Sequence, residues 1–542
     1  MSIDHLPTPP VIARLATAVL EPTPKTPSFQ INTKNKSYKY QYSNIYFVRL
    51  RLLREFVEER AHRRWSKIAG EPILVPRVLE VVKSRLCYIV GTVYMDMPLK
   101  PNVMEDIARD HSIPPPPPNP KFHSPEDNIM LEDESGRIRL VGERVKGARL
   151  VTGVIIGALG AETPNGDFEV VDLCYPGMAP QAGQDTEAPK EDNGMDVDDD
   201  AGASADEWVA VVSGLDIGSP SPPDAQIQML VEYLTGEEGG VADQVSASQI
   251  SRLIIAGNSL APLAPTANGE AAESSQSQRK AKRYGYDAAT FSPHPVLSLS
   301  DHLLDIASAL PVHILPGETD PSGTILPQQN LPKAMFGAVS KLPTFSCETN
   351  PTYIRFGSLP ETEEAPATRP PLARTLLVNS GQPLNDMFKY LPSPPNTRLS
   401  ILESTLKWRH MAPTAPDTLW CHPYFGGDPF IMTETPDVYI VGNQKRFATK
   451  MIVEREESEQ SDNGNGPKTR CRVVMVPEFA RTGVLVLVNL RTLDVKTMTF
   501  SVQGMTGAGE QLESQCESVP PASPPVTIEP SSAPNSSPDP DY

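Results

Sequence analysis

Four segments of the chain place polar side chains directly after short runs of apolar, strand-forming residues. They are Val211–Gly218 (VVSGLDIG), Ile254–Ser259 (IIAGNS), Leu315–Pro321 (LPGETDP) and Val438–Lys445 (VYIVGNQK). The carboxylates of Asp and Glu and the amide oxygen of Asn are ligands that hard or borderline divalent metals accept. Metal-assisted hydrolysis is therefore the first chemistry to test against these strand ends.

The order of the four segments resembles that of the calcineurin-like metallophosphoesterases. In that family, successive strand ends read S-D-x-H, G-D, G-N-H-D and G-H-x-H, and the resemblance implies two metal ions that activate a water for in-line attack on phosphorus. The positions of this chain that correspond to the family's ligands are Gly214, Asp216, Asn258, Glu318, Thr319, Asn443 and Lys445.

Most of these positions no longer carry a ligand that could hold two cations. Gly214 has no side chain, and Asn258 keeps an oxygen without the negative charge of an aspartate. Lys445 would add a positive charge beside two dications, which Coulomb repulsion strongly disfavours at low dielectric. We therefore expect no catalytic, cofactor-binding or metal-binding residue in this chain, and no cofactor.

One histidine stands where the family has a further ligand, His410 in the segment Trp408–Pro413. A lone imidazole cannot hold a binuclear centre, so a structural, hydrogen-bonded histidine is the favoured interpretation. The alternative is an active metallophosphoesterase or exonuclease. Its metal would require Asp216, Asn258, Asp320 and His410.

The composition indicates folded domains with long irregular insertions. The chain has 542 residues, 58 prolines and a formal net charge of −19, and much of this charge lies in the acidic stretch at 187–200. An acidic chain is a poor candidate for wrapping nucleic acid. The six cysteines form no C-x-x-C pair. Neither a signal peptide nor an apolar run of membrane-spanning length is evident, so we expect an intracellular protein without membrane contact.

Residues 86–180 are predicted to form an OB-fold β-barrel. Strand-like runs lie at Cys87–Met97, Leu150–Leu159 and Phe168–Leu173. Asn128–Leu140 holds two further runs on either side of the hairpin signal Glu132–Gly136. A helix from Asn44 precedes them, with an apolar stripe of Ile45, Val48, Leu52 and Phe56. The barrel has few aromatic residues interleaved with Lys or Arg, which favours protein docking over a second alternative function, single-strand binding.

After the acidic stretch the pattern becomes α/β. Near-continuous apolar strands end at Gly turns, as in Trp208–Val212, Ser251–Ala256 and Val312–Leu315. Helices are predicted at Ala225–Leu234 and at Asp301–Leu310, the second with Ser300 as its N-terminal cap. The predicted fold class is thus α+β or α/β, an OB-fold barrel followed by a phosphoesterase-like β-sandwich with flanking helices. The expected units are a disordered N-terminus (1–43), a helical segment (44–85), the barrel (86–180), an acidic disordered loop (181–207), the sandwich domain (208–504) and a disordered Pro/Ser-rich tail (505–542). Residues 264–287, 358–372 and 455–469 are expected to be inserted loops.

This domain order resembles the B-subunits of eukaryotic replicative DNA polymerases. Segments that carry the resemblance are NIYFVRLRLL (44–53), LPQQ (326–329), SGQPLND (380–386), RHMAPTAPDTL (409–419) and DPFI (428–431), and the APTAPDTL run points to the delta branch. The resemblance implies a nuclear, non-catalytic scaffold for DNA replication and repair. It would hold the cysteine-rich C-terminal module of the catalytic subunit and a third subunit, and would meet DNA only indirectly.

Overall fold

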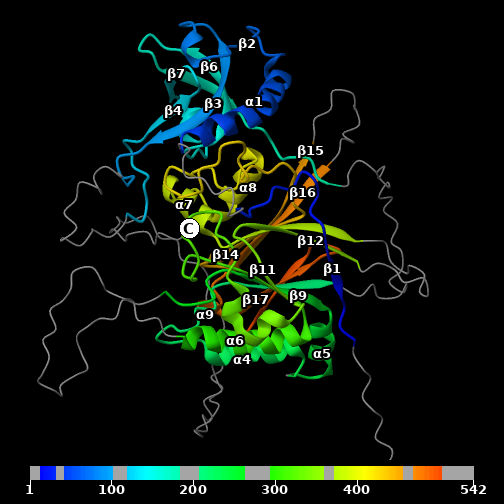
Figure 1. Cartoon of the computed structure of the whole chain (residues 1–542). Coiled ribbons are helices and arrows are strands. Elements are labelled where there is room, and N and C mark those ends of the chain that lie inside the picture. The colour runs from blue at the N-terminus through cyan, green and yellow to red at the C-terminus, as the bar shows by residue number, and fades with distance from the viewer. Residues whose placement is uncertain are drawn as a thin grey trace, which may run out of the picture.

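In a computed structural model, residues 13–31, 42–101, 119–182, 207–237, 239–262, 293–358, 372–455 and 468–502 are described. They form a small β-barrel stacked on a larger layered domain (Figure 1). None of the helices in these ranges is long and apolar enough to cross a membrane.

The barrel follows the predicted order of strands. Its members are β2 (Ile73–Leu74), β3 (Cys87–Asp96), β4 (Asn128–Glu132), β5 (Arg137–Val141), β6 (Ile155–Glu162) and β7 (Phe168–Cys174), with the short helix α3 (Glu143–Lys146) between β5 and β6. The sheet order is β2-β3-β4-β5-β7-β6, and pairing of β3 with β6 closes it. The predicted OB fold is confirmed. Gly91 does not interrupt β3, because its missing side chain lets the backbone of Glu132 approach: a Cβ there would lie 2.6 Å from that carbonyl oxygen.

Helix α1 (Asn44–Trp65) starts where the sequence predicted but buries a different stripe. Leu52 and Phe56, expected in the core, are 42% and 41% exposed. The buried row runs at four-residue spacing through Ile45, Arg49, Leu53, Val57, Ala61 and Trp65. The predicted stripe is thus confirmed for Ile45 and Val48, which are buried, and wrong for Leu52 and Phe56, since the buried row continues through Arg49 and Leu53 instead. The helical segment predicted to reach residue 85 ends at Trp65, and a short 3₁₀ turn, η2 (Val78–Glu80), follows β2.

The second domain is a four-layer α/β/β/α sandwich (Figure 1). One sheet has the order β1-β12-β13-β14-β16-β15 and the other β11-β10-β9-β8-β17-β18. The strands of the first sheet are β1 (Thr17–Leu20), β12 (Thr352–Ser358), β13 (Ala373–Asn379), β14 (Val438–Gln444), β16 (Lys468–Pro477) and β15 (Ala448–Arg455). Those of the second are β11 (Phe345–Cys347), β10 (Val312–Leu315), β9 (Ile250–Ala256), β8 (Trp208–Val212), β17 (Val484–Asn489) and β18 (Val495–Thr499).

Helices cover the outer face of each sheet. On the side away from the barrel lie α4 (Asp224–Thr235), α5 (Val241–Ser248) and α6 (His294–Ala309), with the irregular 3₁₀ segment η3 (Lys333–Lys341) against α6 and β11. On the barrel side lie α7 (Gln382–Tyr390) and α8 (Arg398–Trp408), and a single turn, α9 (Phe479–Thr482), leads into β17. All five residues of β8 are buried because this strand is covered on both faces, as its uninterrupted apolar run predicted.

Two expectations about this domain were wrong. Part of the predicted disordered N-terminus is ordered: β1 pairs antiparallel with β12, Arg14 Nη2 donates to the carbonyl of Leu234 (2.6 Å), and Phe29 is buried. Helix α6 starts at His294 instead of Asp301, and the proposed cap, Ser300, is a buried residue inside it. Most of the acidic stretch, the three predicted insertions and the C-terminal tail lie outside the described residues.

Candidate functional site

The structure brings the ends of β8, β9, β10 and β14 together, as the motif order predicted. The N–H of Gly214 donates to the carbonyl of Gly257 (2.9 Å), and the N–H of Asn443 donates to Ser213 Oγ (2.9 Å). The Nδ2 of Asn443 donates to the carbonyl of Ser380 (2.9 Å). A Cβ built on Gly317 would overlap the side chain of Asn258. Three of the positions that correspond to phosphoesterase ligands, Gly214, Asn258 and Asn443, therefore lie in one cluster at these strand ends.

Backbone geometry accounts for several of the residue types in this cluster. Asp216, Asn258 and Asn443 have φ near +54°, and Gly214 has φ +64°. Glycine, Asn and Asp are the residues that tolerate left-handed backbone most readily. A tight turn at each strand end is thus sufficient reason for these side chains, without any metal.

The carboxylate of Asp320 is held by hydrogen bonds from backbone N–H groups. Its carboxylate accepts from the N–H groups of Leu260 (2.9 Å) and Gly317 (2.8 Å), and its side chain is buried. Burial raises the pKa of Asp320, although these backbone donors oppose the rise. Thr319 joins the same two loops, because its Oγ1 donates to the carbonyl of Leu260 (2.7 Å). Asp320 and Thr319 tie the loop after β10 to the loop after β9.

The remaining positions do not complete a metal site. Glu318 and Lys445 are exposed, and Asp216 is half-buried with its pKa raised by burial. A Cβ at Gly214 would lie 3.0 Å from Asn443 Oδ1 and 3.1 Å from Glu478, so a side chain there would require these neighbours to shift. Among the described residues, no three His, Cys, Asp or Glu side chains come close enough to share an ion.

Two buried oxygens at these strand ends, Asn443 Oδ1 and Ser259 Oγ, have no hydrogen-bond partner among the described residues. Two neutral oxygens are far short of the oxygen shell that a hard cation requires. The residues present therefore do not fit a binuclear metal centre.

Neutral side chains cross-link the strand ends instead. We call Gln328, Asn350, Ser380 and Gln382 the amide cluster. Asn350 Nδ2 donates to Gln328 Oε1 (2.7 Å), Ser380 Oγ (2.7 Å) and Gln382 Oε1 (2.9 Å), and Asn350 Oδ1 accepts from the N–H of Ser380 (3.0 Å). Gln328 Nε2 reaches the carbonyl of Gly317 (2.9 Å).

Sequence reasoning did not assign roles to the amide cluster. Three of its members lie in the segments LPQQ and SGQPLND, which carried the family resemblance, so a signal was present. Asn350 lies in neither segment, and nothing in its neighbours' types marks it.

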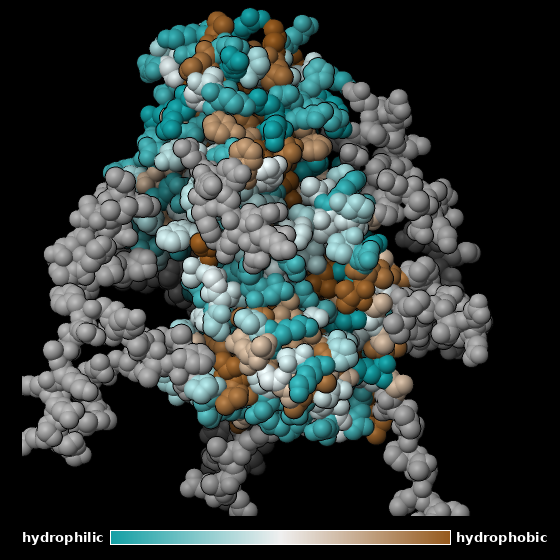
Figure 2. All heavy atoms as spheres, in the orientation of Figure 1, coloured by the Kyte–Doolittle hydropathy of each residue, from teal (hydrophilic) through white to brown (hydrophobic). Residues whose placement is uncertain are grey.

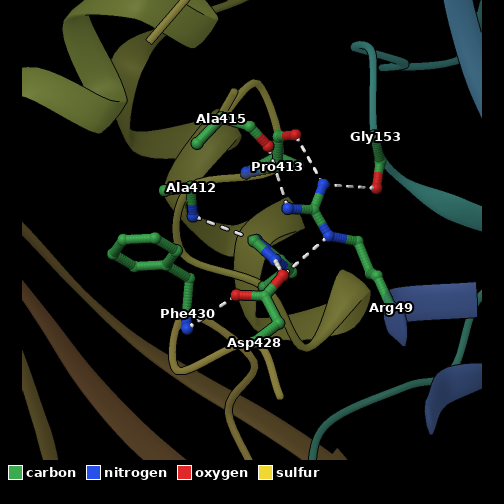
Figure 3. A network of polar contacts seen from close by, with 8 residues as sticks. Arg49, Gly153, Ala412, Pro413, Ala415, Asp428 and Phe430 are labelled. Carbon is green, nitrogen blue, oxygen red and sulfur yellow. Dashed lines mark hydrogen bonds and ion pairs between the residues drawn. The ribbon is translucent and has the colours of Figure 1, made fainter. Parts of the chain in front are cut away.

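His410 belongs to a different site, at the junction of the two domains (Figure 3). Its Nε2 lies 2.8 Å from Asp428 Oδ2, and its Nδ1 accepts from the N–H of Ala412 (3.1 Å). Arg49 Nε, from α1 of the barrel domain, lies 2.9 Å from the same Asp428 oxygen. We call Arg49, His410 and Asp428 the junction triad. His410 is hydrogen-bonded on both ring nitrogens, and its purely structural role stays a prediction.

Arg49 forms hydrogen bonds from all three nitrogens of its guanidinium at the junction. Nη1 donates to the carbonyls of Gly153 (3.2 Å) and Pro413 (2.7 Å), and Nη2 donates to that of Ala415 (2.9 Å) (Figure 3). The side chains of Arg49 and Asp428 are both 0% exposed. A buried charge is tolerated when it is paired and hydrogen-bonded, as the charges of Arg49 and Asp428 are here.

The charge state of the triad follows from its contacts. Since Nδ1 of His410 accepts a hydrogen bond, the proton of the neutral ring lies on Nε2 and points at Asp428. Burial, together with the nearby charge of Arg49, lowers the pKa of His410 to about 4. Burial would raise the pKa of Asp428, but Arg49 and His410 outweigh it and the pKa is lowered. The triad thus holds one ion pair and a neutral imidazole.

The domain order and the degenerate strand-end cluster define a class, the B-subunits of DNA polymerases. The family described as "DNA polymerase delta subunit OB-fold domain" matches residues 41–173, and the family of the B-subunits of DNA polymerases alpha and epsilon matches residues 209–449. The first match covers α1 and the barrel, and the second covers most of the sandwich domain.

Relatives that match most of the chain show to which branch of this class it belongs. The chain is 35% identical to the "DNA polymerase delta small subunit" of Arabidopsis thaliana, with 85% of this chain and 92% of the relative covered. It is 31% identical to the protein of that name from Saccharomyces cerevisiae (88% and 93% covered) and 32% identical to "DNA polymerase delta subunit 2" of Drosophila melanogaster (86% and 95% covered). The chain belongs to the DNA polymerase delta small-subunit family.

Proposed function

We propose that this chain is a non-catalytic accessory subunit of DNA polymerase delta, whose phosphoesterase-like domain has become a structural element. The observation that carries the proposal is the amide cluster. It fills the meeting point of the strand ends with neutral hydrogen bonds, where a binuclear enzyme would need carboxylates and imidazoles. A site cross-linked in this way has neither the charge to attract two cations nor an open coordination position for water.

Under this proposal the chain works through its surfaces. The barrel and the sandwich domain together would dock the cysteine-rich C-terminal module of the catalytic subunit, and another face would hold a third subunit. The chain would act in the nucleus, in DNA replication and repair, and would meet DNA only through the assembly. Its net charge of −19 supports this indirect contact, since phosphate repels an acidic surface.

Two measurements test the proposal. The full chain, co-expressed with the catalytic and third subunits of the same organism's polymerase delta, is expected to co-purify with both in a salt-resistant complex. The purified chain is expected to release no nitrophenol from bis-p-nitrophenyl phosphate with added Mn²⁺ or Mg²⁺. Turnover that disappears in Asp216→Asn and in Asp320→Asn, with folding intact by circular dichroism, would establish the enzyme and end the scaffold proposal.

A further inference from the structure

The described N-terminal residues, 13–31, run along the edge of the first sheet before the chain reaches α1, and we call them the strap. At one end Arg14 donates to the carbonyl of Ala247 in α5 (2.8 Å), and at the other Phe29 is buried against Phe430 at the junction of the two domains. Figure 1 shows this path, from α5 past β12 to the barrel side. Within the strap, β1 covers β12, which would otherwise be the open edge of the sheet.

Between these two ends the strap makes a turn at the surface. The N–H of Thr26 donates to the carbonyl of Thr23 (3.0 Å), and the two residues between them, Pro24 and Lys25, are exposed. Hydrophobic residues reach the surface on the right of Figure 2, the side on which Figure 1 shows β1, and Val19 of β1 is 53% exposed. The strap is therefore a surface element that another protein can reach.

The two threonine hydroxyls of this turn fasten it to the second domain. Thr23 Oγ1 donates to the carboxylate of Glu434, and the hydroxyls of Thr23 and Thr26 lie 2.8 Å apart. A hydroxyl has a single proton, so Thr26 is the donor in the second of these bonds. In addition, Thr433 Oγ1 donates to the carbonyl of Lys25 (2.7 Å). The turn is thus held by a chain of hydrogen bonds that ends on a carboxylate.

Two carboxylates face this turn, and only one of them is neutralised. A small pocket beside Thr26 is lined by Glu434 and Asp437. Arg374 lies 3.2 Å from Asp437, whereas Glu434 forms no ion pair with any residue that the structure describes. An anionic group added to the turn would therefore meet a charge of the same sign.

The turn also carries, twice, the dipeptide that proline-directed protein kinases recognise: Thr23-Pro24 and Thr26-Pro27. The residue before a proline is biased towards extended backbone, the conformation in which a kinase cleft takes its substrate. Thr163-Pro164, in the turn between β6 and β7, is a dipeptide of the same kind, but the hydroxyl of Thr163 accepts from the nearby N–H of Asp167 (3.2 Å). The hydroxyl of Thr23 differs because it donates to a carboxylate 411 residues away.

We propose that Thr23 is a phosphorylation site of a proline-directed kinase and that its phosphorylation releases the strap from the second domain. Thr23 Oγ1 forms a bond to the γ-phosphorus of ATP, the bond from that phosphorus to the β–γ bridging oxygen breaks, ADP leaves, and a base of the kinase takes the hydroxyl proton. The proton that was donated to Glu434 is lost, and the new group carries a charge of about −1.5 to −2. Repulsion by Glu434 then disfavours the docked strap.

The docked strap is itself a poor substrate, because the reacting hydroxyl is bonded to Glu434. The kinase acts on a minor, detached state, and the phosphate then favours that state, since a modification shifts an equilibrium by its different interactions with the two states. Detachment would withdraw Phe29 from its contacts with Tyr353 and Phe430, whose ring centres lie 5.6 Å and 6.2 Å away. The strap would thereby act as a cover over aromatic side chains at the domain junction.

The test treats the full chain with a purified cyclin-dependent kinase and ATP. Mass spectrometry is expected to find phosphate on Thr23, and amide hydrogen exchange in residues 17–31 is expected to become at least tenfold faster after treatment. The Thr23→Val/Thr26→Val chain should show no change in strap exchange when it is treated in the same way. Glu434→Gln should still be phosphorylated on Thr23 but should lose most of the increase in exchange, because the repelling charge is gone.

A second measurement needs no kinase. Thr23→Glu should speed the exchange of the strap amides at least tenfold, and addition of Glu434→Gln to this variant should remove most of that increase. Ser28→Glu, at an exposed position of the same strap, is the matched control and should leave the exchange unchanged.

Three results would overturn the inference. The first is a treated chain without phosphate on Thr23. The second is phosphate on Thr23 with unchanged strap exchange. The third is slower exchange, which would follow if Arg355, now a donor to the carbonyl of Glu21 (3.4 Å), paired with the phosphate and tightened the strap. None of these results bears on whether the chain is a polymerase subunit.

Discussion

The guanidinium of Arg49 lies 2.9 Å from the carboxylate of Asp428, although 379 residues separate them in the chain and each belongs to a different domain. Arg49 replaces an apolar side chain in the buried row of α1, and Asp428 accepts from it, from His410 and from the N–H of Phe430 (3.0 Å). The barrel and the sandwich domain therefore share a buried polar contact and should unfold together.

Removing the positive charge at this contact should destabilise the whole chain. Arg49→Met leaves Asp428 buried without its counter-ion, so the free energy of unfolding should fall by about 3–5 kcal/mol. The double variant Arg49→Met/Asp428→Leu should recover part of this loss, because no unpaired charge stays buried. Urea denaturation measures both. Arg54→Met, at a partly exposed ion pair, is the control and should cost less than about 1 kcal/mol. Equal losses at Arg49 and Arg54 would contradict the assignment.

The junction triad should make stability depend on pH in the mildly acidic range. The pKa of His410 is about 4 in the folded protein, below its usual value of 6.5. Between these two values the unfolded chain binds a proton that the folded protein does not. The free energy of unfolding should therefore fall as pH drops from 6.5 to 4, by up to about 3 kcal/mol.

The control for this pH dependence is His410→Gln, whose amide can still donate to Asp428 but does not titrate. Denaturation midpoints of both proteins, measured at several pH values, give the comparison. The free energy of unfolding of the wild type should fall relative to that of the variant only below pH 6.5. Parallel curves for the two proteins would show that His410 is not the titrating group.

A negative charge introduced into the amide cluster should destabilise the protein. Asn350→Asp replaces a buried donor to three oxygens with a further acceptor, so the free energy of unfolding should drop by about 3 kcal/mol or more at neutral pH. Part of the loss should return when the new carboxyl is protonated near pH 4. The exposed Asn119→Asp is the matched control and should be nearly neutral. Added Mn²⁺ that stabilised Asn350→Asp by several degrees would instead reveal a latent cation site.

Restoring an aspartate at the first degenerate position should not restore metal binding. Gly214→Asp places a Cβ at φ +64°, against Asn443 and Glu478, and should cost about 1–3 kcal/mol. Gly426→Asp, where an added Cβ meets nothing within 4 Å, is the control for a new surface charge. Thermal unfolding with and without Mn²⁺ decides the matter. A metal-dependent rise in melting temperature for Gly214→Asp alone would contradict the structural account.

The ordered N-terminal strap, residues 13–31, should contribute to stability through one aromatic residue. Phe29 is 3% exposed and stacks on Tyr353, with ring centres 5.6 Å apart, in the core beneath the junction triad. Phe29→Ala should lower the free energy of unfolding by about 3 kcal/mol. Val19→Ala, on the same segment but 53% exposed, should change it by less than about 0.5 kcal/mol. If Phe29→Ala left the free energy of unfolding unchanged, the prediction of a disordered N-terminus would hold for this segment.

Much of the fold could be predicted because it follows from the spacing of apolar and turn residues along the sequence. The buried run of β8 and the hairpin turn between β4 and β5 depend on neighbouring residues alone, and the structure places both where they were expected. The start of α6 was missed because its first turn, after Pro293, carries no capping side chain, while Ser300 resembles a cap. Local signals fail where several positions satisfy the same rule.

The sequence by itself determined the order of the elements and the loss of ligand types at the strand ends. Gly214 has no side-chain ligand to offer a cation in any fold, and Lys445 brings the wrong charge. Only the tertiary structure decided what Arg49, His410 and Asn350 do. Their partners are remote in the chain, and the free energy of a buried charge or amide depends on which groups surround it after folding. The residue type fixes which interactions a side chain can make, and the folded structure decides with which partner it makes them.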